Sequence, residues 1–283
     1  MTALLELHDV RKSYGTRRAV DGLSLTVNRG EVVALLGANG AGKTTTLEIA
    51  LGLRKADSGE VRLHARPVGV TPQETGMPNN LRVREIAGFV AKHYDTRPDV
   101  DAILAPFGLE AFANRQAGGL SGGELRKLAL ALAFAPKPEL VILDEPTTGL
   151  DIESRRNVWS YVRAYVSGGG TVLLTTHHME EAEALASRVC VMGAGRIVHD
   201  APPSGIRRMV GTRRLTYAGE PFDPSTFGID ATVVCDEGRV TIAARDTDAL
   251  VRAMVTNGIV FADLCVLDAT LEDAVVTLTE VRR

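Results

Sequence analysis

Two hydrophobic patterns alternate along the first part of the chain. Mostly apolar runs occupy residues 31–36, 140–143 and 171–175, as expected for strands that are buried on both faces of a parallel sheet. Apolar positions at helical spacing occur in the segments that follow two of these runs, 44–51 and 152–166. This alternation of buried strands and helices predicts an α/β core with a mixed sheet.

A second group of strands has a different pattern. Residues 23–27 alternate apolar and polar side chains, as in a half-exposed antiparallel strand, and residues 4–10 also read as a strand. Residues 12–15 are read as a turn, and short strands are expected at 61–63 and 68–71. The alternating strand at 23–27 predicts an antiparallel β subdomain beside the core.

A helical stretch then interrupts the alternation of strands and helices. Residues 81–94 and 100–107 carry apolar side chains at helical spacing, and a further helix begins near Ser121. The interruption predicts an inserted helical subdomain at about 74–138.

The last part of the chain has a third pattern, in which strands and helices are mixed. Pro202 and Pro203 mark a boundary, and a short basic helix at 206–210 follows them. Strands and helices are then mixed, with strands at 213–217, 231–235, 239–243 and 259–266 and helices at 246–258 and 269–280. We therefore expect a first domain at 1–205 and a small α+β domain at 211–283.

Composition excludes some classes of protein. The formal net charge is −3 and the pI is about 6.1, so no overall basic field indicates a nucleic-acid partner, and none is expected. The three cysteines are far apart, which favours reduced core thiols over disulfides or a metal site. No apolar run approaches the ~18–20 residues needed to cross a bilayer, so any membrane span would belong to another polypeptide.

Residues Gly37–Thr44 match G-x-x-x-x-G-K-[ST], the phosphate-binding (Walker A) loop. The motif follows an apolar strand and opens a helix, so backbone amides and the helix dipole would converge on an anion. Lys43 would reach the β- and γ-phosphates, and the Thr44 hydroxyl would bind Mg²⁺. The loop predicts a bound nucleoside triphosphate, but it does not indicate what hydrolysis drives.

An acidic pair, Asp144 and Glu145, stands at the carboxyl end of the apolar run 140–143. Buried carboxylates are costly without a partner, and Mg²⁺ would stabilise Asp144. Glu145 is then placed to take a proton from an attacking water. The alternative is a solvated turn before Pro146, which the phosphate-binding loop upstream disfavours.

Other polar residues stay undecided on local pattern alone. Tyr14 is either a platform for a base or an amphipathic packing residue, and Gln73 is either a ligand at a strand end or a loop glutamine. Ser121 and Glu124 form a capping box, S-x-x-E, which is either only a cap or a second anion site. The histidines at 177–178 follow a strand, where a polar contact to a ligand is favoured over a metal site.

Taken in order, these stretches resemble ATP-binding subunits of ABC transporters over residues 4 to about 205. Five stretches carry the resemblance besides the phosphate-binding loop: Leu120–Glu124 (the signature sequence), Gly149–Asp151 (the D-loop), Gln73 (the Q-loop), Tyr14 (the adenine-stacking aromatic) and Thr176–His177 (the switch histidine). Two departures are visible. Glu124 stands where the signature usually has Gln, and Ala38 stands where the loop commonly has Pro.

The resemblance implies a P-loop NTPase fold that binds ATP and Mg²⁺ and works as a head-to-tail dimer. Each ATP would lie between Lys43 of one subunit and Ser121 and Gly123 of the other. Glu145 would be the general base, His177 would contact the γ-phosphate, and Thr44, Gln73 and Asp144 would surround the Mg²⁺. The implied nucleotide contacts are Tyr14, Gly37, Ala38, Asn39, Gly40, Ala41, Gly42, Lys43, Thr44, Thr45, Gln73, Ser121, Gly122, Gly123, Glu124 and Asp151.

The resemblance also implies partners. The helical subdomain would contact integral-membrane permease subunits on separate chains, at the cytoplasmic face of the cell membrane. Residues Asp268–Thr279 resemble an ending seen in ATPases of bacterial multidrug and antibiotic exporters, daunorubicin-type included, so drugs or other small hydrophobic compounds are the expected cargo.

Two alternatives remain. The same ATPase could energise an importer or a lipid or polysaccharide exporter. A soluble ABC ATPase that acts on DNA or ribosomes is disfavoured, because this chain has one cassette and a short insert.

Overall fold

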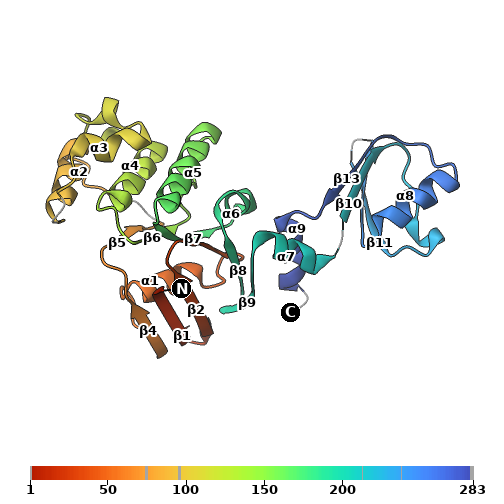
Figure 1. The fold of residues 1–283 in the computed structure, drawn as a ribbon, viewed down its shortest axis with the longest axis horizontal. Coiled ribbons are helices and arrows are strands. Elements are labelled where there is room, and N and C mark those ends of the chain that lie inside the picture. The colour runs from red at the N-terminus through yellow and green to blue at the C-terminus, as the bar shows by residue number, and fades with distance from the viewer. Residues whose placement is uncertain (1, 74–75, 95–96, 212, 237, 281–283) are drawn as a thin grey trace. The chain divides into compact units, whose positions relative to one another are not determined.

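The computed structural model describes residues 2–73, 76–94, 97–211, 213–236 and 238–280 (Figure 1). The chain divides into two compact units, Met1–Pro202 and Pro203–Arg283. The division falls at the Pro202-Pro203 pair, so helix α7 (Pro203–Val210) belongs to the second unit and begins earlier than expected. The expected start of the helical subdomain at 74 and the end of the chain at 281–283 lie outside the described residues.

A six-stranded sheet forms the centre of the first unit. Its strand order is β5 (Val68–Thr71), β6 (Leu140–Asp144), β7 (Thr171–Thr176), β3 (Val32–Leu36), β8 (Arg188–Gly193) and β9 (Arg196–Ala201). All neighbours pair in parallel except β8 and β9. Every residue of β3, β6 and β7 is buried, as the apolar runs predicted. The carboxyl ends of these strands therefore meet at one edge of the sheet.

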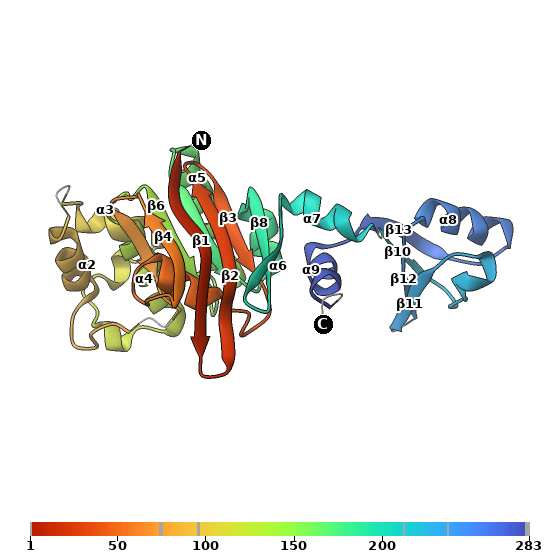
Figure 2. The ribbon, with the colours of Figure 1, turned by 90° about the horizontal axis from the view of Figure 1, so that it is seen from below.

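The antiparallel subdomain is a three-stranded sheet of β2 (Arg17–Asn28), β1 (Ala3–Tyr14) and β4 (Ser58–Leu63) (Figure 2). The turn expected at 12–15 is wrong, because β1 continues to Tyr14. The Asp57 carboxylate accepts hydrogen bonds from the backbone N–H of Ser13 and from Lys12 Nζ, both at 2.7 Å, and so holds this end of β1 in the sheet.

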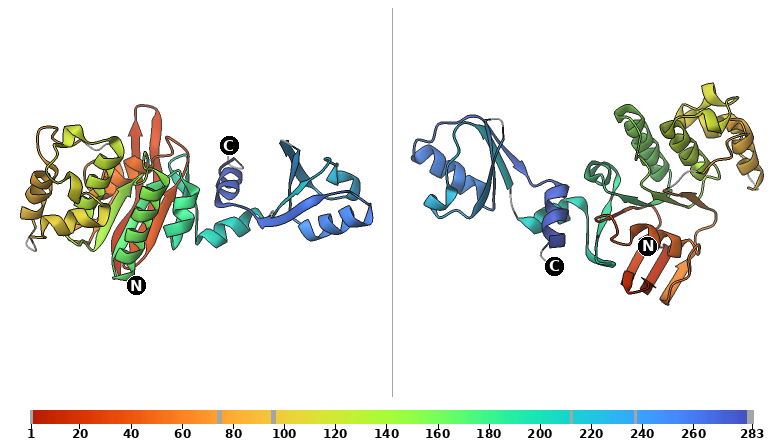
Figure 3. Two further views of the ribbon diagram at one scale, coloured as in Figure 1. Left: turned by 90° about the horizontal axis from the view of Figure 1, so that it is seen from above. Right: turned by 180° about the vertical axis from the view of Figure 1, so that it is seen from behind.

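Helices cover both faces of the six-stranded sheet (Figure 3). Helix α1 (Lys43–Ala50) shares a hydrophobic core with β1, β2 and β3, while α5 (Ile152–Ser167) and α6 (Met179–Leu185) lie on the opposite face. The inserted subdomain consists of α2 (Val83–Lys92), α3 (Val100–Leu104), α4 (Gly122–Phe134) and the 3-10 turns Ala105–Phe107, Glu110–Phe112 and Ala117–Gly119. Helix α4 begins at the predicted cap Ser121.

The second unit has its own four-stranded antiparallel sheet, in the order β11 (Ala231–Asp236), β12 (Arg239–Ala244), β10 (Arg213–Ala218) and β13 (Ala262–Asp268). Its core packs Leu215, Tyr217 and Ile242 of the sheet against Leu250 and Met254 of α8 (Thr247–Thr256). Helix α9 (Leu271–Glu280) packs against α7, and a 3-10 turn spans Pro224–Phe227. The predicted α+β character of this region is confirmed.

The cysteines agree only in part with the expectation of core thiols. Cys190 is buried in β8, but Cys235 and Cys265 are exposed. Cys265 lies between Leu264 and Val266, which pack against the core of the small sheet, so its side chain is on the other face, and Cys235 lies near the exposed end of the edge strand β11. Among the described residues, no group of three or more His, Cys, Asp or Glu side chains is arranged to hold a metal ion. No helix in the described part of the chain is long and apolar enough to cross a membrane.

Candidate functional site

The loop between β3 and α1 requires its glycines. Gly40 and Gly42 have φ angles of 81° and 103°, which side-chain-bearing residues rarely adopt. A Cβ on Gly42 would lie 2.1 Å from the Ala19 carbonyl oxygen, and one on Gly37 would lie 2.7 Å from that of Met192. Gly42 caps α1 without a side-chain hydrogen bond, so amides of the first turn remain for an anion. The loop thus has the geometry of a phosphate cradle.

Lys43 places a buried positive charge at this loop. Its side chain donates hydrogen bonds to the carbonyl oxygens of Gly37 at 2.7 Å and Ala38 at 3.3 Å. Burial lowers the pKa of Lys43, and the carboxylates of Glu145 and Asp144 oppose this shift. An ammonium held among loop carbonyls is well placed to meet a polyphosphate.

Glu145 lies directly after β6 in a strained backbone conformation, with φ at 50°. Its backbone N–H donates to the carbonyl oxygen and to the hydroxyl of Thr175, both at 3.1 Å, which holds the strained residue against β7. The Glu145 carboxylate Oε2 lies 3.1 Å from His177 Nδ1 and accepts a hydrogen bond from the Thr148 hydroxyl at 3.2 Å. These contacts fix the direction in which the carboxylate points.

Three oxygen-bearing side chains converge beside Glu145. Thr44, Gln73 and Asp144 together line a hollow of about 310 Å³. Asp144 is buried and accepts a hydrogen bond from the Thr175 hydroxyl. Hydroxyl, amide and carboxylate oxygens are the ligand types that Mg²⁺ uses, so this donor set fits a magnesium ion.

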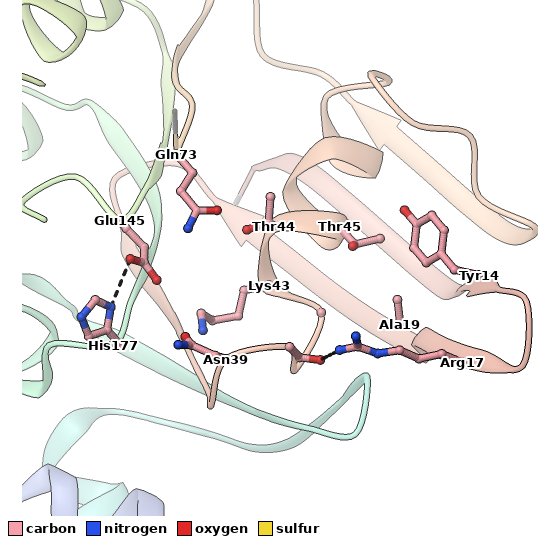
Figure 4. A pocket seen from close by; sticks show the side chains of 12 residues that line it. Tyr14, Arg17, Ala19, Asn39, Lys43, Thr44, Thr45, Gln73, Glu145 and His177 are labelled. Carbon is pink, nitrogen blue, oxygen red and sulfur yellow. Dashed lines mark hydrogen bonds and ion pairs between the residues drawn. The ribbon is translucent and has the colours of Figure 1, made fainter. Parts of the chain in front are cut away.

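The larger cavity has a volume of about 450 Å³, which is the size range of small-ligand sites (Figure 4). Two of its lining residues, Arg17 and Ala19, were not predicted. The other ten were: Tyr14, Asn39, Gly40, Gly42, Lys43, Thr44, Thr45, Gln73, Glu145 and His177. Figure 4 shows Gln73, Glu145 and His177 on one side of Lys43 and Tyr14 on the other. The structure therefore joins strand ends and a hairpin that are far apart in sequence.

Of the other predicted residues, Gly37, Ala38 and Ala41 belong to the loop but do not line the cavity, and Asp144 lines only the smaller hollow. The remaining five form a second surface. Ser121, Gly122, Gly123, Glu124 and Asp151 do not line the cavity. The capping box is formed, since the Ser121 hydroxyl accepts from the Glu124 N–H at 3.3 Å and Glu124 Oε2 accepts from the Ser121 N–H at 2.6 Å.

The signature stretch and the D-loop stretch lie side by side on that surface. A Cβ on Gly123 would lie 3.5 Å from the Gly149 carbonyl oxygen. Asp151 caps α5 and accepts hydrogen bonds from the Ser154 N–H at 2.7 Å and hydroxyl at 2.9 Å, which lower the pKa of Asp151. Within this chain, Asp151 therefore acts as the N-cap of α5.

Two arginines of the site were not predicted. Arg17 donates a hydrogen bond to the Gly40 carbonyl oxygen at 2.8 Å, at the rim of the cavity. Arg126 is buried in α4, and the sequence signal was a charged residue among the apolar positions of that helix.

The second histidine of the predicted pair, His178, is the N-cap residue of α6 and does not line the cavity. Burial lowers the pKa of His178.

Sequence comparison places the chain among similar proteins. A model of the family described as "ABC transporter" matches residues 20–148. The chain is 41% identical over 220 residues to a "Nod factor export ATP-binding protein I" of Paraburkholderia xenovorans (strain LB400), covering 72% of each chain. It is 40% identical over 241 residues to the protein of that name from Cupriavidus metallidurans, covering 79% of this chain and 80% of the relative.

Solved structures share the fold. A structure titled "Structure of ATP binding subunit of ABC transporter" superposes with a TM-score of 0.67 at 26% identity, covering 74% of this chain and 93% of that one. A dimeric ATP-binding cassette in a post-hydrolysis state, bound to ADP and Pi, gives a TM-score of 0.65 at 24% identity, covering 70% and 98%.

Proposed function

Because this chain belongs to the ABC transporter family and hydrolyses ATP to drive transport, we propose that the cavity around Lys43 is its nucleotide site. The convergence of Lys43, Gln73, Glu145 and His177 on one cavity carries the proposal. The phosphates lie on the amides of the loop and the first turn of α1, and Lys43 transfers its hydrogen bonds from loop carbonyls to phosphate oxygens.

The adenine ring stacks on Tyr14, at the other end of the cavity. Tyr14 is 43% exposed, so one part of its ring is free for a base. The Arg54 guanidinium lies 5.3 Å from the ring centroid and Lys12 Nζ lies 5.9 Å from it, which holds the ring in place. Aromatic rings stack on any base, so this contact contributes affinity more than selectivity.

Glu145 acts as the general base of hydrolysis. It accepts a proton from a water molecule whose oxygen attacks the γ-phosphorus, the bond from that phosphorus to the bridging oxygen breaks, and ADP leaves. His177 contacts the γ-phosphate and, through its 3.1 Å contact, keeps the Glu145 carboxylate aimed at the water. Thr44, Gln73 and Asp144 would hold a Mg²⁺ ion, which would supply positive charge to neutralise the phosphates.

The surface formed by Ser121, Gly122, Gly123, Glu124 and Asp151 completes the nucleotide site of a second subunit. Its separation from the cavity of its own chain supports this arrangement. Ser121 and Gly122 are exposed at the start of a 13-residue helix, where amides face outward. In a head-to-tail dimer, ATP would join Lys43 of one subunit to Ser121 of the other, and hydrolysis would release them.

The transport partner is an integral-membrane permease on a separate chain, contacted through the inserted helical subdomain at the cytoplasmic face of the membrane. The direction is export, because the two relatives described above are named as export proteins. The resemblance of Asp268–Thr279 to drug-exporter ATPases supports drugs or small hydrophobic compounds as cargo. The relatives are named for Nod factor, so a Nod-factor-like cargo is the second candidate.

Mixing two inactive variants tests the shared site. In a head-to-tail dimer, a Lys43→Ala subunit paired with a Ser121→Ala subunit contains one site with both residues intact. Each variant alone should be inactive, and an equal mixture should recover up to about a quarter of wild-type ATPase activity through random pairing. If the mixture stays inactive while tagged copies of the two variants co-purify in the presence of ATP, each site is built within one chain.

Cargo is tested separately with the permease that co-purifies with the chain. The complex is reconstituted in lipid vesicles, and ATP-dependent uptake is measured for labelled daunorubicin and for a labelled Nod factor. Transport of daunorubicin alone supports the drug reading, and transport of Nod factor alone favours the second candidate.

A further inference from the structure

Arg126 is a charged side chain that is only 5% exposed, and hydrolysis as described above does not use it. It lies in α4, the helix that Ser121 caps. Its guanidinium donates to the main-chain carbonyl oxygens of Pro72 (2.6 Å), Gln73 (3.3 Å), Asp144, Glu145 (2.7 Å) and Pro146 (3.1 Å). The arginine side chain has five N–H donors, so each carbonyl in this set has one donor.

The acceptors come from two places in the fold. Pro72 and Gln73 follow β5, and the residues from Asp144 to Pro146 form the end of β6 and the turn after it. Strands β5 and β6 are neighbours in the sheet, so the guanidinium bridges the segments that follow their carboxyl ends through hydrogen bonds. Main-chain carbonyls, unlike side chains, cannot turn away, so the flat guanidinium fixes the spacing of the two segments.

We propose that Arg126 is a positioning residue that holds Gln73 and Glu145 in their places for hydrolysis and ties both to α4. This inference rests on the proposed role of Glu145. Since Ser121 and Arg126 belong to one helix, any displacement of that helix is carried to the general base. Contact of Ser121 with a nucleotide on the second subunit is thereby coupled to the geometry of Glu145 in its own subunit.

Burial of the Arg126 charge is tolerated because each N–H donor of the guanidinium has a carbonyl acceptor. Burial lowers the pKa of Arg126, and the carboxylates of Asp144, Glu145 and Glu181 oppose that shift. A buried charge without such partners would be strongly unfavourable. An apolar side chain of similar length would fill the space but leave the carbonyls without their donors. Arg126→Met is therefore the informative change.

The test uses the purified full chain and compares Arg126→Met with Arg126→Lys. Arg84→Met serves as the matched control, because Arg84 is an exposed arginine of α2 outside the cavity and the signature surface. ATP turnover is followed by phosphate release, nucleotide affinity by fluorescence of a labelled ATP, and folding by thermal melting.

We expect Arg126→Met to lower kcat about 10- to 100-fold, as small misplacements of reacting groups do, with ATP affinity within threefold of wild type. Arg126→Lys should recover part of the loss, because an ammonium has three donors for five carbonyls. Arg84→Met should match wild type. A kcat near wild type for Arg126→Met, or equal losses of kcat and affinity, would overturn the proposal.

Two further outcomes are decisive. If Arg126→Met does not fold, Arg126→Lys decides: lowered kcat with unchanged affinity supports the proposal, and wild-type kcat overturns it. The parallel variant Glu145→Gln separates this inference from the proposed function. Loss of turnover in Glu145→Gln together with full turnover in Arg126→Met would leave the general base in place and reject the positioning role.

Discussion

His177 Nδ1 lies 3.1 Å from Glu145 Oε2, and this contact joins the ends of two neighbouring parallel strands. The Glu145 side chain is 12% exposed, whereas that of His177 is 45% exposed, so the histidine reaches the carboxylate from the open side of the cavity. In the proposed mechanism, Glu145 is the base that this contact holds in place, and the exposed His177 is the partner that contacts the γ-phosphate.

Replacement of His177 tests that division of roles. His177→Ala should lower kcat about 10- to 100-fold, because the carboxylate of Glu145 loses an orienting donor. ATP affinity should change much less, since Lys43 and the loop amides remain. His178→Ala is the matched control: His178 is the next residue and does not line the cavity, so its variant should keep most activity. Equal losses in the two variants would contradict the assignment.

Gly42→Ala should destabilise the protein and remove nucleotide binding. The new Cβ would lie 2.1 Å from the Ala19 carbonyl oxygen, at a residue whose φ is 103°. Strain and overpacking together should cost about 2–4 kcal/mol of unfolding free energy in urea. Gly15→Ala is the matched control, because Gly15 has a φ of 58° and nothing within 4 Å of the added Cβ. It should cost about 1 kcal/mol and spare ATP binding.

Glu181 should make stability depend on pH. Burial raises the pKa of this carboxyl, although Oε1 accepts a hydrogen bond from Trp159 Nε1 at 3.2 Å. A carboxyl whose pKa is raised on folding binds its proton more tightly in the folded state, so stability falls as pH rises above the unfolded value of about 4.5. Glu181→Gln should therefore gain stability relative to wild type between pH 5 and pH 8.

Urea unfolding of wild type and Glu181→Gln at pH 5 and at pH 8 measures this difference in unfolding free energy directly. Trp159→Phe, which removes the donor but keeps Glu181, should retain the pH dependence. An unfolding free energy whose pH dependence is the same in wild type and Glu181→Gln would show that Glu181 does not titrate as described.

The two units should be separable. A chain that ends at Pro202 should fold and bind ATP, because every residue that lines the two hollows around Lys43 and Asp144 belongs to the first unit. Thermal melting and nucleotide fluorescence would check this. A truncated chain that folds but does not bind ATP would show that the second unit contributes to the nucleotide site.

Sequence patterns predicted the elements whose cause is local. Buried parallel strands produce apolar runs, and the loop of Gly37–Thr44 carries glycine at Gly40 and Gly42, whose positive φ angles are a local requirement of the turn. Helix α7 was predicted to begin three residues late, because Pro203 was read as a break, although proline is well suited to the first turn of a helix.

Features that depend on distant contacts were not predicted. The end of β1 is held by Asp57, which lies far along the chain, so residues 12–15 looked like a turn. Arg126 contacts carbonyls that only the folded sheet brings together, and no spacing in the sequence reveals them. Likewise, only the small sheet shows that Cys235 and Cys265 lie on its edge strands.

The most direct test of the account is ATP turnover of Glu145→Gln beside Glu153→Gln, an exposed glutamate in the first turn of α5. Removing the base should lower kcat by about 10²- to 10⁴-fold, with ATP affinity within threefold of wild type and ATP-dependent dimers accumulating on gel filtration. Glu153→Gln should match wild type. Full turnover by Glu145→Gln would show that the base lies elsewhere and would contradict the central claim.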